Sequence, residues 1–163
     1  MEIRRGGEAD IPFIMATERL AGYEHLVGRS DEAQHRSTLA DPRYAYFVGS
    51  EASEPIGFAV LRDWGSAELV VLVKRIAVTR PGAGFGRRFL AEIVGMVFRE
   101  TDAHRICLGL FPENERARRA YGAGGFTAEG ISRGSAFFGG GNRDELVMAL
   151  LKPEWAARHA SPS

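Results

Sequence analysis

The chain reads VVLVKRIAVTRPGAGFGRR from Val70 to Arg88, and this stretch decides its fold. The β-branched run at 69–78 predicts a buried central strand. Glycines then alternate with other residues at Gly82, Gly84 and Gly86. Apolar residues follow at the spacing of one helix face, at positions 89, 90, 93, 94, 97 and 98. The stretch therefore predicts a strand, a glycine loop and a helix in succession.

Such a junction is suited to an anion. The N–H groups of the first helical turn lack partners inside the helix, and the helix dipole adds partial positive charge. Glycine allows close approach of the backbone, and Arg87 and Arg88 add two charges. The spacing is neither the dinucleotide pattern Gly-x-Gly-x-x-Gly nor a nucleoside triphosphate loop ending in Lys-Ser/Thr. We expect a phosphate site, with a tight turn that binds nothing as the alternative.

The remaining pattern predicts a mixed α/β domain. Further strands are expected at 3–5, 44–49, 56–64, 105–111, 126–135 and 144–151. Further helices are expected at 8–20, at 31–39 with Ser30 as N-cap, and at 114–123. Glycines at 139–141 predict a hairpin between the last two strands. This order is not a regular βαβ repeat, and we expect one domain at 1–158 followed by a loose tail at 159–163.

Composition narrows the function classes. The chain has 163 residues and equal numbers of basic and acidic residues, 21 of each, which argues against a nucleic-acid or membrane partner. The single cysteine, Cys107, excludes an intrachain disulfide and a multi-cysteine zinc site. The chain begins without the apolar core of a signal peptide, and it has no apolar run of 18 residues. We expect a cytoplasmic protein without a metal.

A second motif follows the glycine loop. The pattern Asn-x-x-Ala-x-x-x-Tyr-x-x-x-Gly-Phe begins at Asn114, and it places Asn114, Ala117 and Tyr121 on one helix face. Together the two motifs resemble the GNAT superfamily of acetyl-coenzyme A-dependent N-acetyltransferases, over about residues 70–151. The segments at 129–133 and 146–150 resemble its branch of ribosomal-protein N-terminal and diamine acetyltransferases. One departure is Pro81, where the family's loop has Arg or Gln; adjacent Arg80 is the candidate substitute.

The resemblance implies a fold and a cofactor site. The fold would be a mixed, mostly antiparallel sheet with splayed fourth and fifth strands, flanked by about four helices. Acetyl-coenzyme A would be the co-substrate, and a homodimer is a common assembly. Its pantetheine arm would lie along the strand edge formed by Ile76, Ala77 and Val78, with Asn114 contacting the arm or the helix that follows. Its pyrophosphate would lie on Gly82, Ala83, Gly84, Phe85, Gly86, Arg87 and Arg88.

The implied chemistry is direct attack of an amine on a thioester in a ternary complex. Tyr121 would face the sulfur, where a phenol with a pKa near ~10 can protonate the departing thiolate. The Ile76 N–H would stabilise the carbonyl oxygen. The strand at 69–79 carries no acidic residue, so Glu68 at its start is the candidate base, with Glu18 and Glu24 as alternatives.

The substrate is expected to be a primary amine, either a peptide α-amine or a small molecule. Deprotonating a lysine-like amine at pH 7.4 costs about 4 kcal/mol, against less than about 1 kcal/mol for an α-amine. Since the strand at 69–79 offers no acidic residue as a base, the amine that costs less to deprotonate, an α-amine, is favoured. Alternatives are another acyl group, a hydroxyl acceptor, or a non-catalytic coenzyme A sensor or scaffold. A nucleotide-binding module would need a different glycine spacing.

Overall fold

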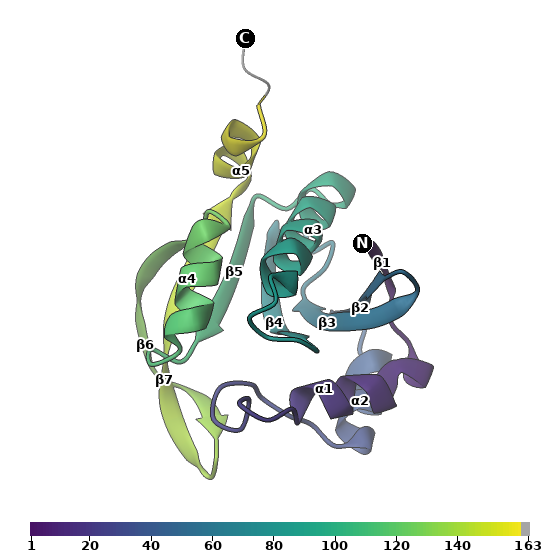
Figure 1. Ribbon diagram of the computed structural model, residues 1–163. Coiled ribbons are helices and arrows are strands. Elements are labelled where there is room, and N and C mark those ends of the chain that lie inside the picture. The colour runs from purple at the N-terminus through teal and green to yellow at the C-terminus, as the bar shows by residue number, and fades with distance from the viewer. Residues whose placement is uncertain (161–163) are drawn as a thin grey trace.

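The computed structural model describes residues 1–160, and within them seven strands form one sheet (Figure 1). The strands are β1 (Glu2–Arg5), β2 (Tyr44–Glu51), β3 (Glu54–Arg62), β4 (Val70–Val78), β5 (Arg105–Leu110), β6 (Thr127–Phe138) and β7 (Gly141–Leu151). The helices are a 3₁₀ turn η1 (Glu8–Asp10), α1 (Ile11–Glu18), α2 (Glu32–Ala40), α3 (Phe85–Glu100), α4 (Glu115–Ala123) and α5 (Lys152–Arg158). The predicted order of elements is confirmed up to β7.

The strand order is β1-β2-β3-β4-β5-β7-β6, and every neighbouring pair is antiparallel except β4 with β5. The parallel pairing joins Val70–Val73 only to Arg105–Leu108. Beyond Val73, β4 continues to pair with β3 but leaves β5. A bulge at Lys74 marks this point, because Val73 and Arg75 pair with adjacent β3 residues. The mixed sheet with splayed fourth and fifth strands is therefore confirmed.

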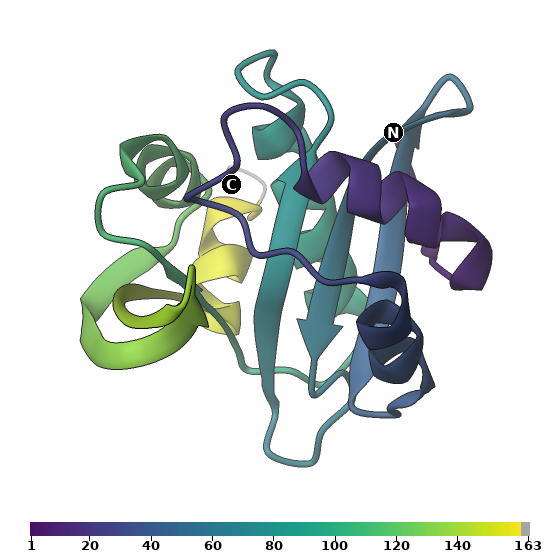
Figure 2. The same ribbon diagram turned by 90° about the horizontal axis from the view of Figure 1, so that it is seen from below.

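Helices cover the sheet on both faces. The apolar stripe of α3 packs on one face, where it joins β4 and β5 residues such as Val71, Val73 and Leu108 in the larger core cluster. On the opposite face, α1 and α2 cover β2 to β4 (Figure 2). A smaller core cluster that includes Ile14 and Phe58 lies between them. The α3 side of β5 and β7 is filled by leucines and Met148, so the alternate residues of these strands face the α1–α2 side.

Four local expectations need correction. The N-cap of α2 is Asp31 rather than Ser30, because the Asp31 carboxylate accepts from the Gln34 N–H at 2.8 Å. The helix predicted at 8–20 is η1 followed by α1, which ends at Glu18. The last two strands extend to Phe138 and from Gly141, since Gly139 and Gly140 alone make the turn. Helix α5 was not expected, and its Trp155 packs on Phe98 with ring centroids 5.4 Å apart.

Of the tail predicted at 159–163, residues 161–163 lie outside the described part of the chain. In residues 1–160 no helix combines the length and apolar character that crossing a membrane requires.

A buried polar network ties α1 and α2 to the sheet. Glu18 is fully buried, and its carboxylate accepts from the Arg75 guanidinium on β4. His35 Nε2 lies 2.8 Å from Glu18 Oε1, and because a carboxylate oxygen accepts, Nε2 carries the proton. His35 Nδ1 lies 2.8 Å from the Tyr46 hydroxyl on β2. The network fixes Arg75 next to the bulge, where the two central strands separate.

This network sets a prediction for stability. The substitution Glu18→Ala leaves the Arg75 guanidinium without its buried counter-ion and should lower the free energy of unfolding by about 3–5 kcal/mol. Urea denaturation measures the change. Glu32→Ala is the matched control, since the exposed Glu32–Arg36 pair on α2 should contribute under about 1 kcal/mol. Equal losses for the two variants would contradict a structural role for the network.

Candidate active site

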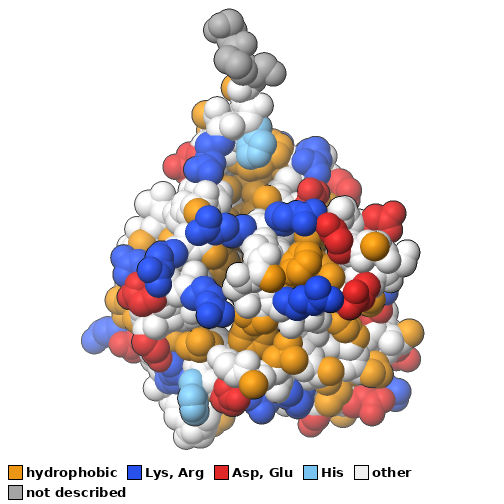
Figure 3. Space-filling model, in the orientation of Figure 1, with side chains coloured by type: hydrophobic (Ala, Val, Ile, Leu, Met, Phe, Trp, Pro, Cys, Tyr) orange, Lys and Arg blue, Asp and Glu red, His pale blue; other side chains and the backbone are white. Residues whose placement is uncertain are grey.

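The cavity that we identify as the site has a volume of about 830 Å³ and opens where β4 and β5 separate. Five parts of the chain line it: the end of β4, the glycine loop with the start of α3, the β5–α4 segment, the loop after α1, and the β6–β7 hairpin. Its lining includes Val73–Val78 from β4 and 108–111 from β5. Figure 3 shows basic side chains gathered over α4 and the start of α3 on this face.

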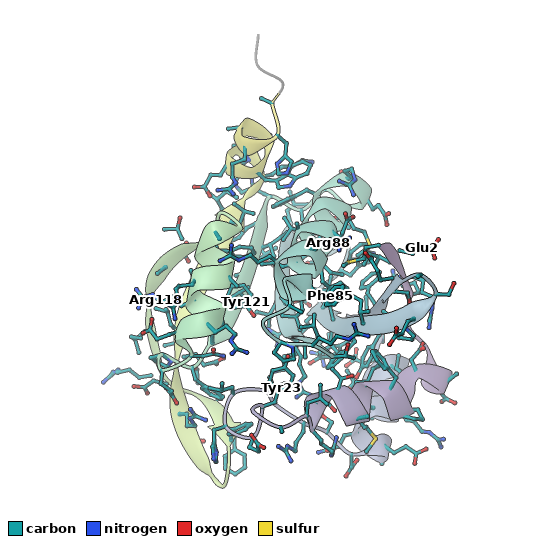
Figure 4. The ribbon with its side chains drawn as sticks, in the orientation of Figure 1. Glu2, Tyr23, Phe85, Arg88, Arg118 and Tyr121 are labelled. Atoms are coloured by element: carbon teal, nitrogen blue, oxygen red, sulfur yellow. The ribbon has the colours of Figure 1, made fainter. Side chains whose placement is uncertain are left out.

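The cavity crosses the sheet from one face to the other. On the α3–α4 side it is lined by Gly86 and Leu90 of α3 and by Tyr121 of α4. On the α1–α2 side it is lined by Tyr23 and by further residues of the loop after α1. Tyr121 and Tyr23 approach the same space from these different elements (Figure 4). The splay therefore gives two ligands access to one point from opposite sides.

The separated end of β4 presents backbone polar groups to the cavity. The Thr79 N–H donates to the Ile56 carbonyl of β3 at 2.8 Å, so the backbone polar groups of Thr79 point toward β3. Because backbone groups alternate along a strand, those of Ile76 and Val78 face the open side. The Tyr23 hydroxyl donates to the Val78 carbonyl at 2.9 Å, whereas the N–H and carbonyl of Ile76 face the cavity. Of the predicted edge, Ile76, Ala77 and Val78 all line the cavity.

The glycine loop has the backbone geometry that its sequence requires. Gly82 and Gly84 have φ angles of 85° and 86°, a region that favours glycine, and Gly84 is the N-cap of α3. Gly86 lies in the first turn, and a Cβ built there would meet only Val78 Cγ2, at 3.9 Å. Gly82 and Gly86 line the cavity, whereas the cavity lining does not include Ala83, Gly84, Phe85, Arg87 and Arg88.

The arginines beside the loop differ in their partners. Arg88 donates to Glu51 at 2.8 Å, and Arg80 donates to Glu54 at 3.3 Å. Both guanidiniums are exposed, so these ion pairs are open to water and exchangeable. Arg87 is exposed at the start of α3. The positive charge around the loop is therefore partly neutralised by the β2–β3 hairpin.

Helix α4 contributes two predicted residues to the cavity. Asn114 is its N-cap, and its side-chain oxygen accepts from the Ala117 N–H at 3.1 Å. Tyr121 is half-buried and packs on Phe126 with ring centroids 6.0 Å apart. Burial, together with the nearby Tyr23, raises the pKa of the Tyr121 phenol to about 12. At neutral pH this hydroxyl is therefore a proton donor.

None of the three carboxylates expected as bases lines the cavity. Glu68 is exposed before β4, and the extended strand from Val70 to Ile76 alone spans about 20 Å at 3.3 Å per residue. Glu24 is exposed and accepts from the Gly22 N–H at 2.8 Å, and hydrogen bonds from its own backbone N–H and from that of Gly22 lower its pKa. Glu18 is paired with Arg75 in the buried network. The expected position of the base at Glu68 is not supported by this geometry.

Two further residues were not expected from the sequence: Glu145, which lines the cavity, and Arg143, which does not line it but contacts Phe111 and Glu113 of its wall. Arg143 of β7 stacks on Phe111, 3.5 Å from its ring centroid, and donates to the His25 carbonyl at 2.9 Å and to Glu113. It thereby holds the loop after α1 against the β6–β7 hairpin. Glu145 of β7 is half-buried and lines the cavity. Neither position belongs to a recognisable motif, because the contacts arise between segments far apart in sequence.

Within residues 1–160, no group of three or more His, Cys, Asp or Glu side chains is placed to hold a metal ion. The residues present do fit a ligand with a phosphate and an extended amide chain. The glycine loop offers a helix N-terminus, and β4 offers an unpaired strand edge beside it.

Comparison with known proteins agrees with this geometry. A spermidine N-acetyltransferase from Vibrio cholerae in complex with CoA and spermine has the same fold, with a TM-score of 0.79 and 21% identity, over 94% of this chain and 96% of that one. A chimera of the V. cholerae enzyme SpeG and hSSAT has a TM-score of 0.81 and 21% identity, with the same shares covered.

The sequence comparisons cover different shares of the chain. A probable N-acetyltransferase, YjcK of Bacillus subtilis (strain 168), is 33% identical over 73 residues, which are 45% of this chain but only 40% of that protein's length. Residues 14–126 match the acetyltransferase (GNAT) family, and this match spans both the glycine loop and the motif that begins at Asn114. The chain therefore belongs to the GNAT family of acetyltransferases.

Proposed function

We propose that the protein is an N-acetyltransferase that moves an acetyl group from acetyl-coenzyme A to a primary amine, either a small molecule or a peptide α-amine. One observation carries this proposal: a single cavity crosses the sheet at the splay of β4 and β5 and is lined from both faces. A ternary complex needs this arrangement, because the two substrates must meet without displacing each other. The homodimer and the cytoplasmic location stay predictions from the sequence.

The residues present fit acetyl-coenzyme A on the α3–α4 side. The first-turn N–H groups of α3, approached through Gly82 and Gly86, would hold the pyrophosphate. The N–H and carbonyl of Ile76 and the N–H of Val78 would pair with the amides of the pantetheine arm, and Asn114 would lie beside it. When bound, the co-substrate supplies a thioester, whose acetyl carbon is the electrophile.

The chain's own residues then have separate roles. The Ile76 N–H, which faces the cavity, would donate to the carbonyl oxygen as negative charge develops there. Tyr121 would donate its proton to the leaving sulfur, and its raised pKa keeps that proton available at neutral pH. The amine would enter from the α1–α2 side, past Tyr23. The two V. cholerae-derived neighbours described above support a small cationic amine as one class of acceptor.

The decisive experiment follows thiol release from acetyl-coenzyme A with α-amino peptides, lysine peptides, polyamines and aminoglycosides. The wild type should release thiol with at least one amine class. Tyr121→Phe should reduce kcat about 100-fold or more, because general acid catalysis contributes ~10²–10⁴-fold. Tight coenzyme A binding without release from any amine would replace the enzyme by a non-catalytic sensor or scaffold. Full activity in Tyr121→Phe would keep the enzyme and remove its proposed acid.

The pKa of Tyr121 sets the alkaline behaviour. Tyrosinate is disfavoured by burial, so Tyr121 should remain protonated up to about pH 11 and should not impose a fall in kcat below that pH. The wild type and Tyr121→Phe are compared by titration of the tyrosine ring carbons in NMR. The signal lost in the variant should titrate near pH 12. A lost signal that titrates near ~pH 10, the range of a free phenol, would contradict enclosure of this side chain.

A substitution at Gly86 should change ligand affinity and stability in opposite directions. Alanine fits at this helical position, since its Cβ would meet only Val78 Cγ2 at ordinary contact distance. Gly86→Ala should therefore raise the free energy of unfolding by up to about 1 kcal/mol through helix propensity. The same methyl group would obstruct phosphate approach and should weaken coenzyme A binding at least tenfold in calorimetry. Unchanged affinity would place the pyrophosphate elsewhere.

A further inference from the structure

Glu145 of β7 occupies a particular place in the cavity. Its neighbour Leu146 pairs with Leu110 of β5, and both leucines belong to the core under α3. Because side chains alternate along a strand, Glu145 faces the α1–α2 side of the sheet. This is the side from which the acceptor amine would enter. Glu145 is half-buried there, whereas the other carboxylates of the cavity wall, Glu113 and Glu115, are exposed.

A glycine on the neighbouring strand makes room for this carboxylate. Gly109 of β5 also lines the cavity, and a Cβ built on it would lie 2.9 Å from the Glu145 Cδ and closer still to its Oε2. The Glu145 side chain therefore lies across the backbone of β5, next to the point where β5 leaves β4. Any larger residue at position 109 would displace it. A glycine inside a strand often marks such a close approach.

The polar partners of Glu145 leave one oxygen available. The Ser135 hydroxyl of β6 lies 2.9 Å from Glu145 Oε1 and 3.0 Å from the Ser132 carbonyl, and when it donates its one proton to Oε1 it holds the carboxylate with Oε2 over Gly109. Within residues 1–160 Glu145 takes part in no ion pair, whereas Glu113 pairs with Arg143 and Glu18 pairs with Arg75. The other titratable or charged groups of the cavity wall are Lys74, Arg75, Arg116, Glu113, Glu115, Tyr23 and Tyr121.

We propose that Glu145 is the general base, binding the acceptor's ammonium group and taking its proton. The inference rests on the proposed acetyl transfer and adds the residue that makes the amine nucleophilic. Once neutral, the nitrogen uses its lone pair to form the N–C bond, and the C–S bond breaks with its electrons on sulfur. Of the two protons that leave the nitrogen, one passes through Glu145 to solvent. The other replaces the proton that Tyr121 gives to sulfur.

The Ile76 N–H and the Glu145 carboxylate, on the two sides of the splay, match the opposite charges of the reacting groups. The Ile76 N–H on β4 faces the cavity where negative charge develops on the carbonyl oxygen. Glu145, held over β5, supplies negative charge where the acceptor nitrogen is positive. Glu18 is neutralised by an arginine in the buried network, and the exposed Glu113 also pairs with an arginine. Glu115 forms no ion pair among residues 1–160 but is exposed, so Glu145 is the half-buried carboxylate of the cavity wall that no cation pairs with.

The test is Glu145→Gln, which keeps the shape and removes the base. In the thiol-release assay, kcat/KM should fall about 100-fold or more. The acid limb of the pH profile should move to follow ionisation of the free amine, so that alkaline pH partly restores the variant. Gly109→Ala should lose activity similarly, since its methyl group displaces the carboxylate. Glu92→Gln, an exposed carboxylate on α3 outside the cavity, should retain wild-type activity.

Binding gives a second readout. Calorimetry should show unchanged coenzyme A affinity in Glu145→Gln but at least tenfold weaker binding of the amine to the coenzyme A complex. If the wild type turns over and Glu145→Gln keeps its kcat/KM and pH profile, this assignment is overturned and the proposed function stands. If the wild type has no activity with any amine, the proposed function fails first. Should Glu145→Gln not fold, Glu145→Asp, which retracts the carboxylate by one methylene, carries the same expected loss.

Discussion

The site depends on one constraint, the end of pairing between β4 and β5 after Val73. Buried backbone N–H and carbonyl groups need partners, and a strand that leaves its neighbour must find new ones. Here the Tyr23 hydroxyl satisfies the Val78 carbonyl, while the Ile76 groups face the cavity. The bulge at Lys74 increases local twist and so helps to turn β4 away. The splay thus creates both the cavity and the polar edge that a ligand with its own amides can complete.

Two of the charged side chains that line the cavity, Arg75 and Glu113, form ion pairs, whereas Lys74, Glu115, Arg116 and Glu145 form none among residues 1–160. Glu18 neutralises Arg75 beneath the bulge, and Glu113 neutralises Arg143 at the hairpin. These two pairs join segments far apart in sequence, so they also hold the loop after α1 and the β6–β7 hairpin in place. The Glu18–Arg75 pair is largely buried, whereas the Glu113–Arg143 pair is partly exposed at the edge of the cavity. In the proposed mechanism Tyr121 donates a proton and Glu145 accepts one, and both line the cavity without an ion-pair partner among residues 1–160.

Local chemistry explains which features could be predicted from the sequence. The positive φ angles of Gly82 and Gly84 and the cap made by Asn114 are properties of short segments, and the sequence shows them directly. The cap at Asp31 was visible in the same way, because Gln34 lies three residues later and completes a capping box that Ser30 lacks. Helix α5 carries a comparable signal in Pro153 and Glu154, whose carboxylate accepts from the Leu151 N–H. A base could not be located along one strand, because the groups that face this cavity come from several elements.

The position of a carboxylate is in fact constrained by the strand that carries it. On β4, the residues that face the α1–α2 side after the bulge are Arg75 and Ala77, and Arg75 is held by the buried Glu18. An acid placed there would compete for that arginine or lose its charge. On the opposite wall, no arginine or lysine among residues 1–160 forms an ion pair with Glu145. Gly109 leaves the space that this side chain from β7 needs to cross β5. In the apolar run Ile106–Phe111, Gly109 is thus the position without a side chain, and the Glu145 side chain from β7 fills the space beside it.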